Sequence, residues 1–315
     1  MIKIFLIFFI FFLINNCSFD KKSGIWTEDV NSEAKNRKIE ILFAKKEIIN
    51  DEFNSDFIIQ TPLKNYKNLV FEDNNDYGFY NLKLNFVKLS KYKFSKIQNF
   101  NNFEPIIGFH KNELIFFDKN GSIIKFDNHS KPLWKKNYYS KREKKNSPIL
   151  NFSIGNEKLI VSDNLSKYYA LDLYSGEKVW SKIHNTTFNS EIKIDKDKFY
   201  IIDSFNIMYC FSLIDGSKLW EFNSDYELIK SQKKLSIVFD KNKVIFNNSK
   251  GDIYALNKNN GNLLWLVTTK DTNENFQTFL LKNSKIVLNN DSLFLSNNMN
   301  NFFSIDANSG FINWK

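Results

Sequence analysis

Short apolar runs recur along the chain from about residue 105 to residue 315. Each run is four to seven residues long and is followed by a polar turn, as at Gly155–Asn156 and Asp240–Asn242. Runs of this length, bounded by turn residues, are typical of β-strands. The pattern therefore predicts an all-β chain of short antiparallel strands.

The apolar runs fall into groups of four, and each group ends in a tryptophan. A spacing of 40 to 49 residues between these tryptophans is typical of the blades of a β-propeller. We therefore predict about five four-stranded antiparallel blades within residues 62–315. The closing tryptophans are Trp134, Trp180, Trp220, Trp265 and Trp314.

Two further runs lie upstream of each closing strand and supply the first and second strands of each blade. We expect these strand pairs at Pro105–Phe109 and Glu113–Phe117, Leu150–Ile154 and Lys158–Val161, Glu191–Ile194 and Lys198–Ile202, Leu235–Phe239 and Lys243–Phe246, and Lys285–Leu288 and Ser292–Leu295.

The turn before each closing strand carries a recurring set of small and polar residues. We predict glycine where the turn needs a positive φ, and short polar side chains that hydrogen-bond the turn backbone. The small residues are expected to leave room for a neighbouring ring, and the tryptophans to seal adjacent blades; stacking on a ligand is the alternative. The residues are Gly176, Gly216, Gly261 and Gly310; Asp172, Asn257 and Asp306; Ser175 and Ser309; and Ala170, Cys210, Ala255 and Ser304.

The N-terminus has the pattern of an export signal. Residues 1–16 combine Lys3 with an apolar run too short to span a bilayer, and Cys17 follows directly. This resembles a bacterial lipoprotein signal, which implies lipidation of Cys17, and Ser18 favours sorting to the outer membrane. A plain secretory signal and an uncleaved anchor are the alternatives. Residues 17–61 are expected to form a polar tether with a short helix around Lys38–Ile49.

The composition excludes several classes of chemistry but points to no particular one. The formal net charge is +9, but the lysines mostly alternate with apolar residues or lie in turns. The densest run, Lys141–Lys145, is expected in a solvated loop, and a contact with a partner or lipid is the alternative. No nucleic-acid motif accompanies it.

Three histidines and two cysteines make a histidine metal site, a catalytic triad or a disulfide scaffold improbable. Asp203 and Asp240 are assigned to turns, with an axial channel as the alternative. We therefore predict no catalytic residue, no metal and no cofactor.

The turn motif is specific enough to identify a family. The sequence Ala170–Trp180 matches the pattern Ala-x-Asp-x-x-Ser-Gly-x-x-x-Trp, and Ser304–Trp314 matches it nearly as well. This resembles the tryptophan-docking motif of PQQ-type propeller repeats. Together with the lipoprotein signal it is similar to BamB-like lipoproteins of the outer-membrane β-barrel assembly machinery.

The resemblance implies a non-catalytic scaffold on the periplasmic face of the outer membrane of a Gram-negative bacterium. Its partners would be the periplasmic domains of BamA, other Bam components and unfolded barrel clients. The family has eight blades, closed by an N-terminal strand that residues 91–96, with Phe94, would supply. Five units predict an incomplete ring in a fragment, and a five-bladed ring is the alternative. A PQQ- and Ca²⁺-dependent dehydrogenase and an anion-binding surface propeller also remain open.

Overall fold

A computed structural model describes residues 90–93, 107–224, 234–269 and 283–315, all within the unit Pro62–Lys315. The predicted signal and tether, Cys17 and Phe94 lie outside these residues. Within them, no helix is both long and apolar enough to cross a bilayer.

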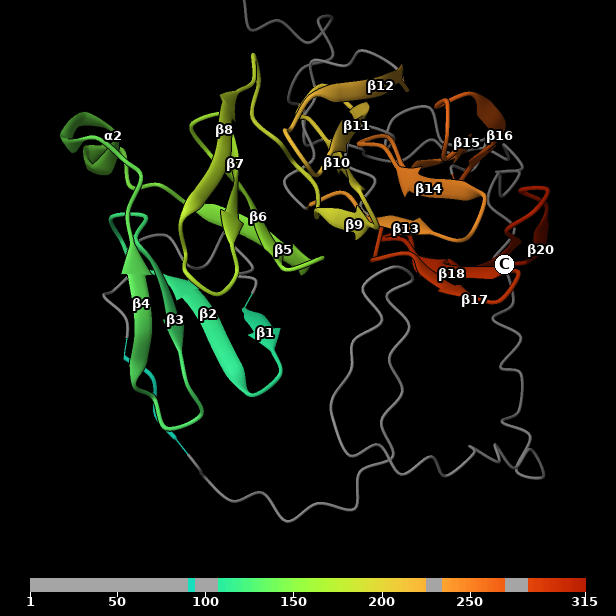
Figure 1. The fold of residues 1–315 in the computed structure, drawn as a ribbon. Coiled ribbons are helices and arrows are strands. Elements are labelled where there is room, and N and C mark those ends of the chain that lie inside the picture. The colour runs from blue at the N-terminus through green and yellow to red at the C-terminus, as the bar shows by residue number, and fades with distance from the viewer. Residues whose placement is uncertain (1–89, 94–106, 225–233, 270–282) are drawn as a thin grey trace, which may run out of the picture. The chain divides into compact units, whose positions relative to one another are not determined.

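The described residues form five four-stranded antiparallel sheets, each built from consecutive strands (Figure 1). The predicted β-propeller architecture of four-stranded blades is confirmed. In chain order the blades are β1 (Gly108–His110), β2 (Glu113–Phe117), β3 (Ile123–Phe126) and β4 (Pro132–Lys136); β5 (Leu150–Gly155), β6 (Lys158–Asp163), β7 (Lys167–Asp172) and β8 (Lys178–Ile183); β9 (Lys193–Asp195), β10 (Lys198–Ile202), β11 (Ile207–Ser212) and β12 (Lys218–Asn223); β13 (Ile237–Phe239), β14 (Lys243–Asn247), β15 (Asp252–Asn257) and β16 (Leu263–Thr268); and β17 (Val287–Asn289), β18 (Ser292–Ser296), β19 (Phe302–Asp306) and β20 (Ile312–Trp314).

The two middle strands of the blades explain why the apolar runs are nearly continuous. Every residue of β14 is buried, as are all but the last of β15, because both faces of these strands pack against neighbouring blades. The outer strands β8 and β12 instead alternate between exposed and half-buried positions. A blade therefore has a buried centre and a solvated outer edge.

The core consists of apolar layers between successive blades. One layer joins Phe117 of the first blade to Tyr169 of the second, and the next joins Ile160 to Phe199 of the third. Two more follow in the same way, between the third and fourth blades and between the fourth and fifth. Each layer needs side chains from both sheets, so a single blade could not bury its own apolar faces.

Several local predictions were wrong. The expected strand starts Glu191, Leu235 and Lys285 each lie two residues before the observed starts of β9, β13 and β17. Lys141–Lys145 is not a loop but the single-turn helix α2 (Lys141–Lys145), because Ser140 and Glu143 form a capping box at its start. The first strand begins at Gly108 rather than at Pro105; Ile107 is described but is not in a strand, and Pro105 lies outside the described residues.

Candidate functional site

The closing tryptophan of each of the first four blades lies on the glycine turn of the following blade. Gly216 has a φ of 69°, and a Cβ there would stand 2.7 Å from the indole of Trp180. Only glycine combines that backbone conformation with so close a ring. The same arrangement joins Trp134 to Gly176, Trp220 to Gly261 and Trp265 to Gly310.

Each of these four indoles also donates a hydrogen bond to the following blade. The acceptor is the backbone carbonyl of the residue directly after the Asp, Ser or Asn that opens the glycine turn. The backbone N–H of this acceptor residue donates in turn to the first hairpin turn of the same blade, as Leu213 N does to Asp197 O at 2.7 Å. One peptide thus ties two turns and the neighbouring indole together. The indole Nε1–O distances are 3.4 Å for Trp134–Leu173, 3.1 Å for Trp180–Leu213, 3.1 Å for Trp220–Lys258 and 3.1 Å for Trp265–Ala307.

The small residues of the motif lie opposite the tryptophan of their own blade. Ala170 pairs with Trp180 and Ala255 with Trp265, and a β-bulge follows each pair. Cys210 and Ser304 pair with Trp220 and Trp314 in the same way.

The opening carboxylates hold the glycine turn. Asp172 Oδ1 accepts from Ser175 N and Ser175 Oγ, both at 2.7 Å. Asp306 receives the same two bonds from Ser309. These hydrogen bonds lower the pKa of both carboxyl groups.

A second recurring turn was missed by the sequence analysis. It joins the second and third strands, and in each blade one side-chain oxygen accepts from the backbone two and four residues later. Asp203 Oδ1, for example, accepts from Phe205 N at 2.8 Å and from Ile207 N at 3.0 Å, so the assignment of Asp203 to a turn is correct. The Asx residues recur at nearly the same spacing as the tryptophans, a signal that could have revealed them: Asp118, Asp163, Asp203, Asn248 and Asn297.

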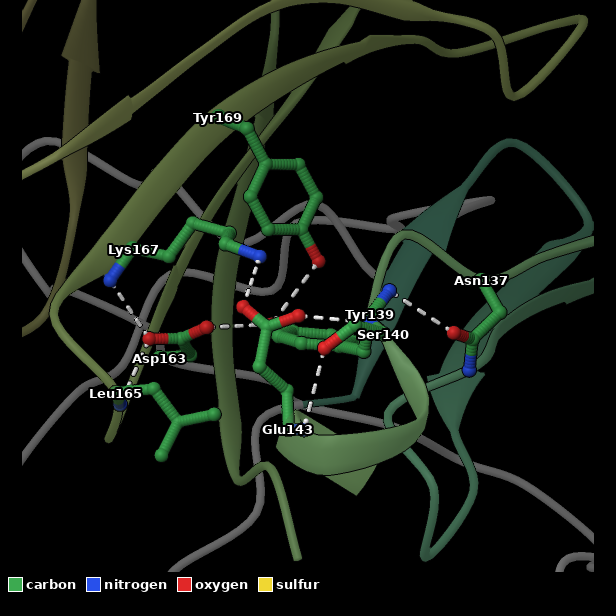
Figure 2. A network of polar contacts seen from close by, with 8 residues as sticks. All are labelled: Asn137, Tyr139, Ser140, Glu143, Asp163, Leu165, Lys167 and Tyr169. Atoms are coloured by element: carbon green, nitrogen blue, oxygen red, sulfur yellow. Dashed lines mark hydrogen bonds and ion pairs between the residues drawn. The ribbon is translucent and has the colours of Figure 1, made fainter. Parts of the chain in front are cut away.

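One of these turns is the centre of a buried polar network (Figure 2). Tyr139 Oη donates to Asp163 Oδ2 at 2.6 Å and lies 3.4 Å from the hydroxyl of Tyr169. Burial raises the pKa of Asp163 and of both tyrosines. The network fixes the connection between the first two blades to the β6–β7 turn.

The same connection is held at its exposed end by an ion pair. Lys167 Nζ lies 2.6 Å from Glu143 Oε1, and Glu143 Oε2 accepts from Ser140 N at 2.7 Å (Figure 2). The hydrogen bond from Lys167, with those from Ser140, lowers the pKa of Glu143 to about 2. Glu143 therefore stays ionised and keeps α2 attached to β7.

The outer strands present a repeated exposed aliphatic side chain. It stands directly before the tryptophan of each of the first four blades and is about half exposed: Leu133, Val179, Leu219 and Leu264. The outermost strand of each sheet also has an edge that no strand of the same sheet covers. Such edges are templates for pairing with another chain.

The described residues do not match the PQQ and Ca²⁺ site of the dehydrogenases that share these repeats. In those dehydrogenases two adjacent cysteines usually lie beneath the quinone, whereas Cys210 is the one cysteine of the described part of the chain and lies fully buried opposite Trp220. Burial raises the pKa of its thiol to about 12. The same part of the chain contains no group of three or more His, Cys, Asp or Glu placed to hold a metal.

Repeated four-stranded blades joined by indole–glycine seams define a β-propeller of the PQQ-repeat class. The chain belongs to the family described as outer membrane protein assembly factor BamB, whose model matches residues 119–315. No curated protein sequence matches the chain.

Two solved structures share the fold. BamB from Moraxella catarrhalis is 14% identical with a TM-score of 0.57, covering 66% of this chain and 62% of that one. The quinohemoprotein alcohol dehydrogenase ADHIIG from Pseudomonas putida HK5 is 12% identical with a TM-score of 0.50, covering 65% and 40%. The chain therefore spans about three-fifths of the length of the solved BamB.

Proposed function

We propose that the chain is a non-catalytic scaffold of the outer-membrane β-barrel assembly machinery. In this proposal Cys17 carries the lipid anchor at the periplasmic face of the outer membrane. The blades bind the periplasmic domains of BamA and assist the folding of barrel clients. The observation that carries the proposal is the family match over residues 119–315, which spans nearly all of the five blades.

The outer edges supply a plausible contact chemistry for β-rich partners. Strand β16 is six residues long and carries no charge, whereas β4, β8 and β12 each carry lysine. Leu264 and Leu266 are 51% and 52% exposed on β16. Charges on an edge strand oppose the addition of another strand, and the uncharged β20 is only three residues long, so β16 is the outer strand best suited to accept one.

Co-purification of the full-length chain with BamA tests the proposal. We expect a complex that survives washing at moderate salt. The variant Leu264→Lys should weaken it at least fivefold, whereas Val179→Lys, on an edge that already carries lysines, should change it less than twofold. No complex with the folded wild-type chain would overturn the scaffold role. Equal effects of the two variants would overturn only the assignment of the contact to β16 and would leave the scaffold role standing.

The shared fold of the alcohol dehydrogenase keeps a quinoprotein enzyme as the second candidate. Adding PQQ and Ca²⁺ to the purified chain, followed by a dye-linked alcohol assay, separates the two. We expect neither a change in the quinone spectrum nor turnover. Turnover that depends on PQQ would replace the scaffold proposal by an enzymatic one.

A further inference from the structure

A pocket of about 640 Å³ opens where the first hairpins of three consecutive blades meet. Its walls come from the β9–β10 turn, the β13–β14 turn, the end of β17 with its turn, and the residue after β15. Three lysines and two aspartates give the lining a formal charge of +1. The lining residues are Asp195, Lys196, Phe239, Asp240, Lys241, Lys258, Leu288 and Asn290.

Lys258 departs from the repeat at a position where the other seams have an apolar side chain. Its counterparts Leu173, Leu213 and Ala307 are no more than 1% exposed, and Lys258 is only 7% exposed. Its backbone makes the same two bonds as theirs, to Asn242 O at 3.0 Å and from Trp220 at 3.1 Å. The seam therefore does not require a lysine, and a buried cation is costly unless it is paired.

The ammonium of Lys258 lies among the other residues that line the pocket. It lies 2.6 Å from Asp195 Oδ2, 2.7 Å from Asp240 O and 4.7 Å from the centre of the Phe239 ring. Asp240 is paired separately with Lys243, at 3.1 Å. Burial alone would raise the pKa of Asp240, but hydrogen bonds from Lys243 and Asn242 lower it overall. Both carboxylates of the pocket are thus already neutralised by a lysine.

The two remaining lysines stand at the rim. Lys196 and Lys241 occupy equivalent places in the first hairpin turns of neighbouring blades, and both are exposed. Neither forms an ion pair within the described ranges of the chain. Two such cations over a concave wall that contains a buried third create a local positive potential.

We propose that this pocket binds a small anion with two or more negative charges, through phosphate or carboxylate oxygens. Lys196 and Lys241 contact the anion from the rim, and the amide of Asn290 donates to it from the fifth blade. Lys258 supplies the buried positive charge. Asp195 lowers the affinity for the anion, because its carboxylate pairs with the ammonium of Lys258 and competes with the anion for it.

Calorimetric titration of the full-length chain at low ionic strength tests the proposal, with inorganic phosphate and with citrate in separate arms. We expect saturable binding of at least one of them at one site. A phosphate preference would identify phosphate ligands, and a citrate preference carboxylates. The double variant Lys196→Gln/Lys241→Gln should weaken binding at least tenfold. The control Lys141→Gln/Lys144→Gln removes the same charge from α2 and should change it less than twofold.

Asp195→Asn supplies a test in the opposite direction. It removes the competing carboxylate, so binding should tighten about threefold or more, whereas a merely structural ion pair would leave binding unchanged or weaker. The proposal is overturned by no binding of either anion, by equal losses in the two double variants, or by unchanged or weaker binding in a folded Asp195→Asn chain.

Discussion

Ser90 Oγ donates a hydrogen bond of 2.9 Å to the backbone carbonyl of Asn128. Asn128 follows Asp127 as Leu173 follows Asp172, so this carbonyl is the one that accepts an indole in each later blade. Tyr92 adds a bond of 3.2 Å to Asp127 O, and its ring meets Phe126 edge-on at 5.5 Å. Residues 90–93 therefore contact the first blade where a preceding tryptophan would dock.

We expect Ser90→Ala to loosen the docking turn of the first blade. It deletes one hydrogen bond, worth about 0.5–1.5 kcal/mol, so amide hydrogen exchange should accelerate in residues 127–131. Ser181→Ala, on the exposed face of β8, is the matched control and should leave exchange in residues 127–131 unchanged. Identical exchange in the wild type and Ser90→Ala would show that the contact does not hold the turn.

Replacing Trp265 by phenylalanine should destabilise the propeller. The indole is 9% exposed, and its loss leaves Ala307 O without its 3.1 Å donor, at a cost of about 1–3 kcal/mol. Trp314→Phe should cost less than about 0.5 kcal/mol, because that side chain is 49% exposed. Urea unfolding of both variants measures the difference, and equal costs would contradict the seam as a stabilising contact.

Gly216→Ala should be more damaging than its small size suggests. The backbone φ of 69° costs an L-residue about 1–3 kcal/mol, and the new Cβ would stand 2.7 Å from Trp180. Ser130→Gly is the matched control, since Ser130 already has a φ of 65° in the turn of the first blade. It should be neutral or stabilising in thermal unfolding, and a loss of stability like that of Gly216→Ala would refute the argument.

The Glu143–Lys167 ion pair should stabilise the folded chain near neutral pH and lose this effect in acid. Its folded pKa is about 2 against an ordinary 4.5, so the stabilisation is complete above about pH 4.5 and is lost as the pH falls towards 2. Urea unfolding of wild type and Glu143→Gln should therefore differ at pH 6 and converge near pH 2. A difference that is constant across this range would exclude the Glu143–Lys167 pair as its source.

The strand pattern could be predicted because it is local. The apolar run between two turns predicts a strand at Lys243–Phe246, and β14 is Lys243–Asn247. An apolar run bounded by turn residues is enough to define the limits of such a strand. Helix α2 was missed because five residues with no apolar face give no periodic signal, and its capping box stabilises it through only one turn. The Asx turns give no signal within a single unit, and only the recurrence of Asp or Asn at the tryptophan spacing indicates them.

The sequence by itself determined the number of Trp-ended units, the four strands in each and the positions of Trp180 and Gly216 within them. These follow from propensity, apolar runs and turn chemistry within about 15 residues. The tertiary structure decided which residues meet across a seam: Trp220 with Lys258, 38 residues apart, and Lys258 with Asp195, from different blades. Such pairings depend on the packing of one sheet on the next, which no local pattern encodes.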